Sequence, residues 1–297
     1  MRALLSLVAF ALLVLLGLMW LGGGFDRLGL WAAQQQRGFQ ESIALSLRAV
    51  RGGETGAVLA LLMACFAYGL AHAAGPGHGK VLIGGYGLGR AVPVVRLSVI
   101  ALAASLAQAV TAIVLVYAGV FLLNLGRQAL VGVTEDFMAP VSYGAIALIG
   151  VWLVWRGLRR FFGPVADHAH TGDDAVCSTC GHAHGPSLDQ VEQTRSLRDA
   201  LVLIGGIALR PCTGALFVLI LTWQMGIGLI GIAGAFAMAL GTGIVTIAVG
   251  VAATGLRGGM LAGISGYPRF AQIAAAVEIL AGGIVVIIAG GLLLRAI

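Results

Sequence analysis

Long apolar runs separated by short polar stretches dominate the chain. A helix needs about 20 mostly apolar residues to cross a bilayer, so these runs predict seven membrane-spanning helices. The predicted spans cover residues 4–21, 57–89, 97–123, 141–155, 200–222, 228–254 and 270–294, and the polar residues at 124–139 predict a loop between two of them. Of the 297 residues, 59% are hydrophobic and only 10% are charged, with a mean hydropathy of +0.99. The fold class that follows is an all-α integral membrane protein, which excludes a soluble one.

The N-terminal part differs from the rest. Residues 4–21 are long enough to span and favour an uncleaved signal anchor, with a cleaved signal peptide as the alternative. Residues 25–54 mix charged and apolar positions and predict an extramembrane or interfacial amphipathic helix. Arginines near the other span ends favour a cytoplasmic N-terminus, and the net charge of +6 reflects this topology rather than binding to nucleic acid.

The segment His72-Ala-Ala-Gly-Pro-Gly-His78-Gly-Lys80 interrupts the second predicted span. Pro76 lacks a backbone N–H and clashes with the preceding turn, so a regular helix does not continue through it. On an unbroken helix the two imidazoles would face directions about 240° apart, whereas a break lets both turn toward one point. Two histidines beside unwound carbonyls predict a site for nickel, cobalt or zinc. The alternative is a kinked helix whose histidines hydrogen-bond to neighbouring helices.

A second segment, Arg210-Pro211-Cys212-Thr213-Gly214, interrupts the fifth span in a similar way. Aligning Pro76 with Pro211 gives two three-helix units of opposite orientation, the inverted-repeat plan common in secondary transporters. The predicted organisation is an anchor and amphipathic segment, a first three-helix repeat, a cytoplasmic loop and a second three-helix repeat. Their ranges are 1–55, 56–160, 161–198 and 199–297.

The loop between the repeats carries six candidate ligands of the softness that zinc, nickel or cobalt prefers. They are His168, His170, Cys177, Cys180, His182 and His184. Their spacing is tighter than in a zinc finger, and the alternative is a disordered polar linker. A flexible loop that captures metal weakly satisfies both descriptions.

Other polar residues lie within the spans, where ionisable groups are costly and often functional. Cys212 and Thr213 are candidate metal ligands opposite the histidines, although a buried cysteine is nearly as often a small hydrophobic residue. Arg210 would balance a carboxylate such as Glu278 or repel cations. Candidate transport-path residues are Lys80, Gln108, Arg210 and Glu278. The alternatives are a topology anchor for Lys80 and an interfacial position for Glu278.

The residues at 72–80, together with Leu-Arg-Pro-Cys-Thr-Gly-Ala at 209–215, resemble the nickel/cobalt transporter family called NicO. The resemblance covers the chain from about residue 62 to the C-terminus. It implies a bacterial inner-membrane permease for nickel or cobalt, with a histidine-bearing loop between its halves. Related nickel permeases carry a His-x4-Asp-His motif. His72 and His78 keep that spacing, but Gly77 replaces the aspartate.

These observations predict a permease, not an enzyme, that exports nickel or cobalt in exchange for protons. The metal is the substrate, no cofactor is expected, and the partners are this cation and the lipid bilayer. No nucleotide-binding motif is present, so the chain alone does not use ATP. The alternatives are an uptake permease or a membrane thiol–disulfide oxidoreductase, which Gly77 disfavours because a cysteine would be needed there. Metal identity and oligomeric state, including a homo-oligomer, stay open.

Overall fold

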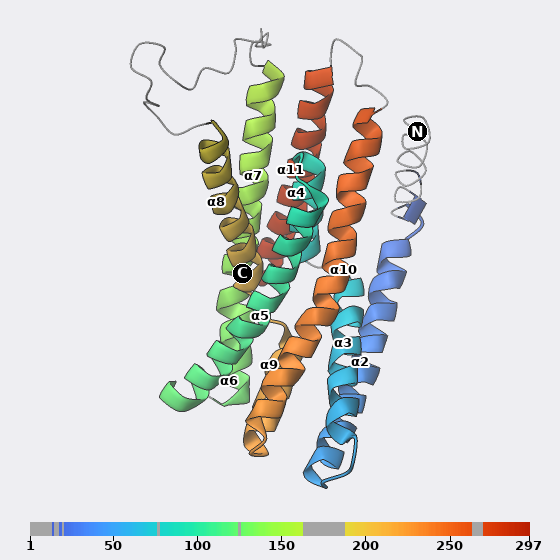
Figure 1. The fold of residues 1–297 in the computed structure, drawn as a ribbon, viewed down its shortest axis with the longest axis vertical. Helices are drawn as coiled ribbons and strands as arrows, with labels where there is room; N and C mark the ends of the chain where they lie inside the picture. Colours follow the sequence, from blue (N-terminus) through green and yellow to red (C-terminus); the bar gives the residue numbers. More distant parts are fainter. Residues whose placement is uncertain are drawn as a thin grey trace.

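The computed structural model describes residues 14, 18–19, 21–75, 78–123, 126–162, 188–262 and 270–297. Within these ranges all regular structure is helical, which confirms the all-α prediction. The helices run up and down in one elongated bundle (Figure 1). Their bounds are α2 Gly24–Arg51, α3 Ala57–Ala74, α4 His78–Gly89, α5 Val94–Leu123, α6 Arg127–Gly132, η1 Val133–Met138, α7 Ala139–Phe162, α8 Leu188–Ala208, α9 Thr213–Gln224, α10 Gly228–Ala262 and α11 Phe270–Ala296.

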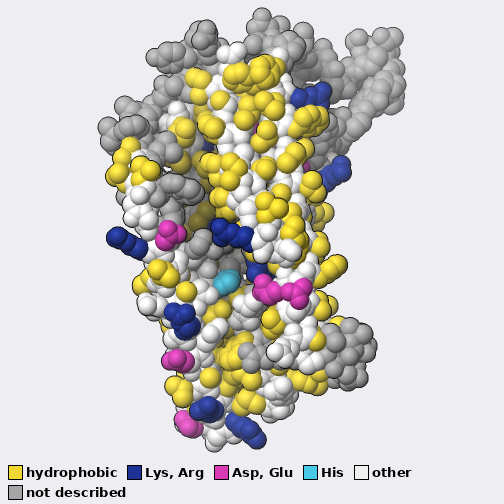
Figure 2. Space-filling model, turned by 180° about the vertical axis from the view of Figure 1, so that it is seen from behind, with side chains coloured by type: hydrophobic (Ala, Val, Ile, Leu, Met, Phe, Trp, Pro, Cys, Tyr) yellow, Lys and Arg dark blue, Asp and Glu magenta, His cyan; other side chains and the backbone are white. Residues whose placement is uncertain are grey.

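Among the described residues, five helices are long and apolar enough to cross a membrane, and the bent pair of α8 and α9 adds a sixth crossing if it counts as one span. The five are Ala57–Ala74, Val94–Val120, Gln128–Phe162, Gly228–Leu261 and Gln272–Ala296. Figure 2 shows large hydrophobic areas on the outside of the bundle, with charged side chains gathered mainly in the lower half of that face. The chain is therefore a multi-pass membrane protein. The first predicted span, residues 4–21, lies largely outside the described residues.

Both predicted helix breaks are present. α3 ends at Ala74, and Gly75 has an extended backbone with φ −66° and ψ 163° before α4 begins at His78. α8 ends at Ala208, and α9 begins after Cys212, whose backbone is extended with φ −69° and ψ 126°. The helices on the two sides of the second break, α8 and α9, are bent by 62° relative to each other. At each break, backbone groups that a continuous helix would use in its own hydrogen bonds are left available for other partners.

The amphipathic segment forms α2, as predicted, but it does not stand apart from the bundle. It packs lengthwise against α3 and also touches α9 (Figure 1). Ala32, Ile43 and Leu47 on its inner face are at most 2% exposed. The apolar stripe of α2 is therefore covered by a candidate membrane span, and its polar positions come within reach of the first break.

The segment 124–139, which we expected to be a loop, is helical over its described residues. α6 and the π-helical turn η1 lead directly into α7. Thr134 is buried and its hydroxyl donates to the carbonyl of Leu130 at 3.0 Å, while Glu135 forms an ion pair with Arg210. Thr134 and Glu135 are thus satisfied within the bundle, so they do not end the helix.

Two apolar clusters form the core, and the breaks lie between them. One cluster joins residues of α2, α3, α5, α6, α9 and α10, and the other joins residues of α4, α5, α7, α8 and α11. α3 and α10 cross closely at two glycines. A Cβ on Gly69 would lie 2.1 Å from the backbone oxygen of Met238, and one on Gly241 would lie 2.3 Å from that of Phe66. Only glycine permits this approach, which fixes α3 beside the part of α10 that faces the second break.

Candidate metal site

His72 and Cys212 come together where the two broken helices meet. His72 lies in the last turn of α3, and Cys212 directly precedes the first residue of α9. The imidazole and the thiol lie close enough to interact with each other. Imidazole and thiolate are both ligands that nickel, cobalt and zinc accept. The structure thus pairs one nitrogen and one sulfur donor from segments 140 residues apart in the chain.

Gln36 of α2 orients the His72 ring. The Oε1 atom of Gln36 lies 3.2 Å from Nδ1 of His72. An amide oxygen only accepts, so Nδ1 carries the proton and donates it, which leaves Nε2 with a lone pair for a metal ion. Metal-binding histidines usually donate their second ring nitrogen to a carbonyl or carboxylate in this way. The prepared tautomer is therefore the one that a metal site requires.

Tyr68 forms the floor of the site. Its ring stacks on that of His72, with centroids 6.0 Å apart and planes inclined by 11°. Its hydroxyl lies within reach of the side chains of Thr213 and Gln40. A Cβ on Gly214 would lie 2.2 Å from the Tyr68 ring, so the glycine of the second motif gives this ring its space. Thr213 is therefore near the site, beside the tyrosine hydroxyl.

Lys80 satisfies the freed carbonyls of the first break. Its ammonium group donates to the backbone oxygens of Ala73 and Gly75. These are the unwound carbonyls that we considered as metal ligands, and the lysine occupies them. Lys80 therefore holds the geometry of the break instead of serving only as a topology anchor.

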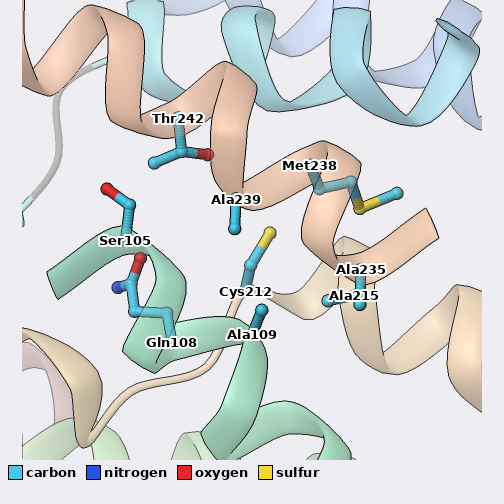
Figure 3. Close-up of a pocket in the computed structure, with 9 residues that line it drawn as sticks. All are labelled: Ser105, Gln108, Ala109, Cys212, Ala215, Ala235, Met238, Ala239 and Thr242. Carbon is cyan, nitrogen blue, oxygen red and sulfur yellow. The ribbon is translucent and has the colours of Figure 1, made fainter. Parts of the chain in front are cut away.

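Gln108 of α5 performs the same task at the second break. Its Nε2 donates to the carbonyl of Ile207 at 3.1 Å and to that of Arg210 at 3.2 Å. Gln108 and Cys212 line one small pocket, together with residues of α10 (Figure 3). A predicted path residue is thus placed beside the predicted cysteine ligand.

The suggested pairing of Arg210 with Glu278 is wrong. Arg210 forms an ion pair with Glu135 at 2.8 Å, donates to the hydroxyl of Tyr143 and lies over that ring, 5.1 Å from its centroid. The charge of the arginine is therefore neutralised by the helix that we had expected to be a loop.

Glu278 lies elsewhere, near the far end of α4, where its side chain packs beside Gly89. It pairs with Arg156 and, at 3.6 Å, with Arg160, and it is only 1% exposed. A buried, doubly paired carboxylate is a structural ion pair in this arrangement rather than an interfacial residue. The structure does not bring Glu278 to His72 and Cys212.

Several predicted ligands lie outside what the structure describes. These are the side chain of His78 and the six loop residues His168, His170, Cys177, Cys180, His182 and His184. Within the described part of the chain, no three His, Cys, Asp or Glu side chains are grouped as a ready metal site. A site shared by both histidines of the first motif stays a prediction.

The sequence analysis missed Gln36, Gln40 and Tyr68. Gln36 and Gln40 are four residues apart on an amphipathic helix, and Tyr68 is four residues before His72, so each pair shares one helix face. This spacing could have indicated that each pair acts together. The packing of α2 on α3, which brings the two pairs into contact, could not be predicted from it.

The fold and the paired breaks define a class, the multi-pass α-helical transport proteins. The family described as NicO, high-affinity nickel-transport protein, matches residues 58–174. The putative nickel/cobalt efflux system of Haemophilus influenzae is 30% identical over 229 residues, which are 71% of this chain and 70% of that protein. No solved structure matches the chain. The chain belongs to the NicO family of nickel/cobalt transporters and is not an enzyme, so the oxidoreductase alternative is wrong.

Proposed function

We propose that this protein exports nickel or cobalt ions from the cytoplasm across the bacterial inner membrane. The observation that carries the proposal is the pairing of His72 with Cys212 at the meeting point of the two broken helices. His78, which begins α4, would add a second imidazole to this site, and the cysteines and histidines of the predicted loop 161–198 would gather metal for it. The name of the Haemophilus influenzae relative, an efflux system, supports the outward direction.

The proposed architecture has seven spans in two inverted three-helix repeats. The crosswise packing of the bundle supports it, because α10 packs on both halves of the first broken helix and α5 packs on both halves of the second. The ion pairs point the same way. Those seen in the described part of the chain, Arg90–Asp199, Glu135–Arg210, Arg156–Glu278 and Arg160–Glu278, each join one proposed repeat to the other. Repeats that rock against each other around a central site would exchange such pairs during transport.

The proposed driving force is an inward movement of protons. Imidazole and thiolate bind these metals only when deprotonated, so metal and protons compete for the same atoms. In a bacterial cell the outside is typically more acidic than the cytoplasm. Protons entering from outside would release the metal there, and the cytoplasmic side would favour the deprotonated ligands that bind it.

Metal content of cells tests the direction. Cells that express the protein should hold less nickel or cobalt than cells without it, and they should survive at higher external metal. Dissipating the proton gradient should remove the difference. Higher metal content in the expressing cells, above all at nanomolar supply, would identify an uptake permease instead.

Replacements in the motif test the site in the same cells. His72→Ala and His78→Ala should each abolish metal resistance while the protein stays in the membrane, whereas normal resistance in both would remove the shared site. Replacing Cys177, Cys180, His182 and His184 together should lower efficiency at low metal and spare it at high metal. A complete loss at every concentration would place the loop on the transport path.

A further inference from the structure

A small pocket lies beside Cys212, between α5 and α10 (Figure 3). Its polar lining consists of Ser105, Gln108, Cys212 and Thr242, and alanines and Met238 complete the wall. The space inside is about the size of one water molecule. Figure 3 shows Ser105, Gln108 and Thr242 on one side of this space and Cys212 on the other, with the sulfur of Cys212 turned toward α10. The pocket is thus small and its walls are mostly apolar. It adjoins the candidate metal site, because Cys212 belongs to both.

The hydroxyl and amide donors that line the pocket are all used on backbone carbonyls. The hydroxyl of Ser105 donates to Ala101 at 3.0 Å, and that of Thr242 donates to Gly69 at 3.4 Å. The amide nitrogen of Gln108 donates to the carbonyls of Ile207, near the end of α8, and Arg210, in the break. Each of these groups therefore presents only oxygen lone pairs to the pocket.

A pocket with this lining discriminates by charge. An anion would meet lone pairs without donors, so its desolvation would not be repaid. A cation that has shed its water would find three neutral oxygens and one sulfur. Neutral oxygens are weaker ligands for nickel and cobalt than imidazole or thiolate, so an ion bound through them is more easily released.

We propose that this pocket is a second station for the transported cation, in which the Cys212 sulfur and the oxygens of Ser105, Gln108 and Thr242 receive the metal from His72. Cys212 belongs to both stations, so the metal moves between them without losing its sulfur ligand. The change exchanges an imidazole nitrogen for neutral oxygens and alters no oxidation state. This inference rests on the proposed function and adds a path to its single site.

The full-length purified chain tests it, with Co²⁺ alone as the probe. Thr242→Val and Ser105→Ala remove one oxygen each at nearly constant volume. Thr246→Val is the matched control, because Thr246 is also on α10 and its hydroxyl also donates to a backbone carbonyl, at 2.8 Å, but it does not line the pocket. Thr242→Ser restores the oxygen and separates loss of a ligand from a general packing defect.

Transport of Co²⁺ into liposomes and the cobalt–thiolate absorption band are measured for each variant. Removing the two pocket oxygens together should slow transport by about tenfold or more, on the scale at which groups around metal sites act. The thiolate band should persist, because His72 and Cys212 still bind the metal. Thr242→Ser and Thr246→Val should transport like the wild type.

The outcomes separate the two proposals. If the wild type transports Co²⁺ and the pocket variants equal Thr246→Val, the second station is refuted while the exporter remains. If Thr242→Ser is as slow as Thr242→Val, the hydroxyl oxygen is not the acting group, and the station is refuted as well. A wild type that neither binds nor moves Co²⁺ refutes the proposed function and this inference together.

Discussion

Replacing Gly69 with alanine should separate α3 from α10 and weaken the whole bundle. The new Cβ would lie 2.1 Å from the backbone oxygen of Met238, and ordinary contact begins at 3.4 Å, so the helices must part by roughly 1.3 Å, the difference between these distances. No side-chain rotation relieves the clash because the atom met is backbone. Overpacking costs about 1–3 kcal/mol, and a clash of this size belongs at the upper end. The better helix propensity of alanine returns up to about 1 kcal/mol. The net loss is then about 2 kcal/mol.

The assay is the free energy of unfolding of the purified protein in detergent, together with metal transport in liposomes. Gly255→Ala is the control, because Gly255 is also on the long helix α10 and its Cβ would meet nothing within 4 Å. It should leave stability unchanged or raise it. Gly69→Ala should also slow transport, since Gly69 lies one turn before His72 and accepts the hydroxyl of Thr242. Equal stability of Gly69→Ala and Gly255→Ala would refute the close approach of α3 and α10.

Three further changes test how the site is held. Gln36→Ala removes the acceptor that fixes the His72 tautomer and should weaken Co²⁺ binding by about 10- to 100-fold in a spectroscopic titration, while Gln36→Glu should bind normally. Equal binding by Gln36→Ala would show that α2 does not orient the ring. Lys80→Met leaves two carbonyls at the first break without their donor and should lower the free energy of unfolding by about 1–3 kcal/mol; unchanged stability would contradict the capping role. Glu135→Lys places a positive charge beside Arg210 and should lower the free energy of unfolding more than Asp136→Lys, which changes an exposed neighbour. A larger loss of stability in Asp136→Lys would show that the Glu135–Arg210 ion pair does not stabilise the protein.

The spans and the breaks could be predicted because each depends on local properties of the chain. An apolar run of sufficient length must be helical in a bilayer, and a proline between small residues must interrupt it. Aligning the two proline motifs also placed Cys212 opposite the first break, and the structure pairs it with His72. His78 and the loop ligands lie outside the described residues and stay predictions.

Pairings between distant residues could not be predicted in the same way. The sequence around Arg210 does not indicate whether it pairs with Glu278 or Glu135, because the partner depends on which helices pack together. Gln36 likewise orients His72 only because α2 packs on α3. The segment before α7 was misjudged for a related reason, since an ion pair supplied by another helix makes its charge tolerable inside the bundle.

Nickel transport by the purified protein in liposomes tests most directly whether metal crosses at the meeting point of the two breaks. The vesicles carry an imposed proton gradient and a trapped metal indicator, and the variants are His72→Ala, Cys212→Ala and, as a control, Cys65→Ala. Cys65 is a free, fully buried cysteine on α3, about two helical turns before His72. The predicted result is proton-driven nickel movement in the wild type and in Cys65→Ala, and none in His72→Ala or Cys212→Ala. Wild-type rates in both His72→Ala and Cys212→Ala would contradict the assignment of the site.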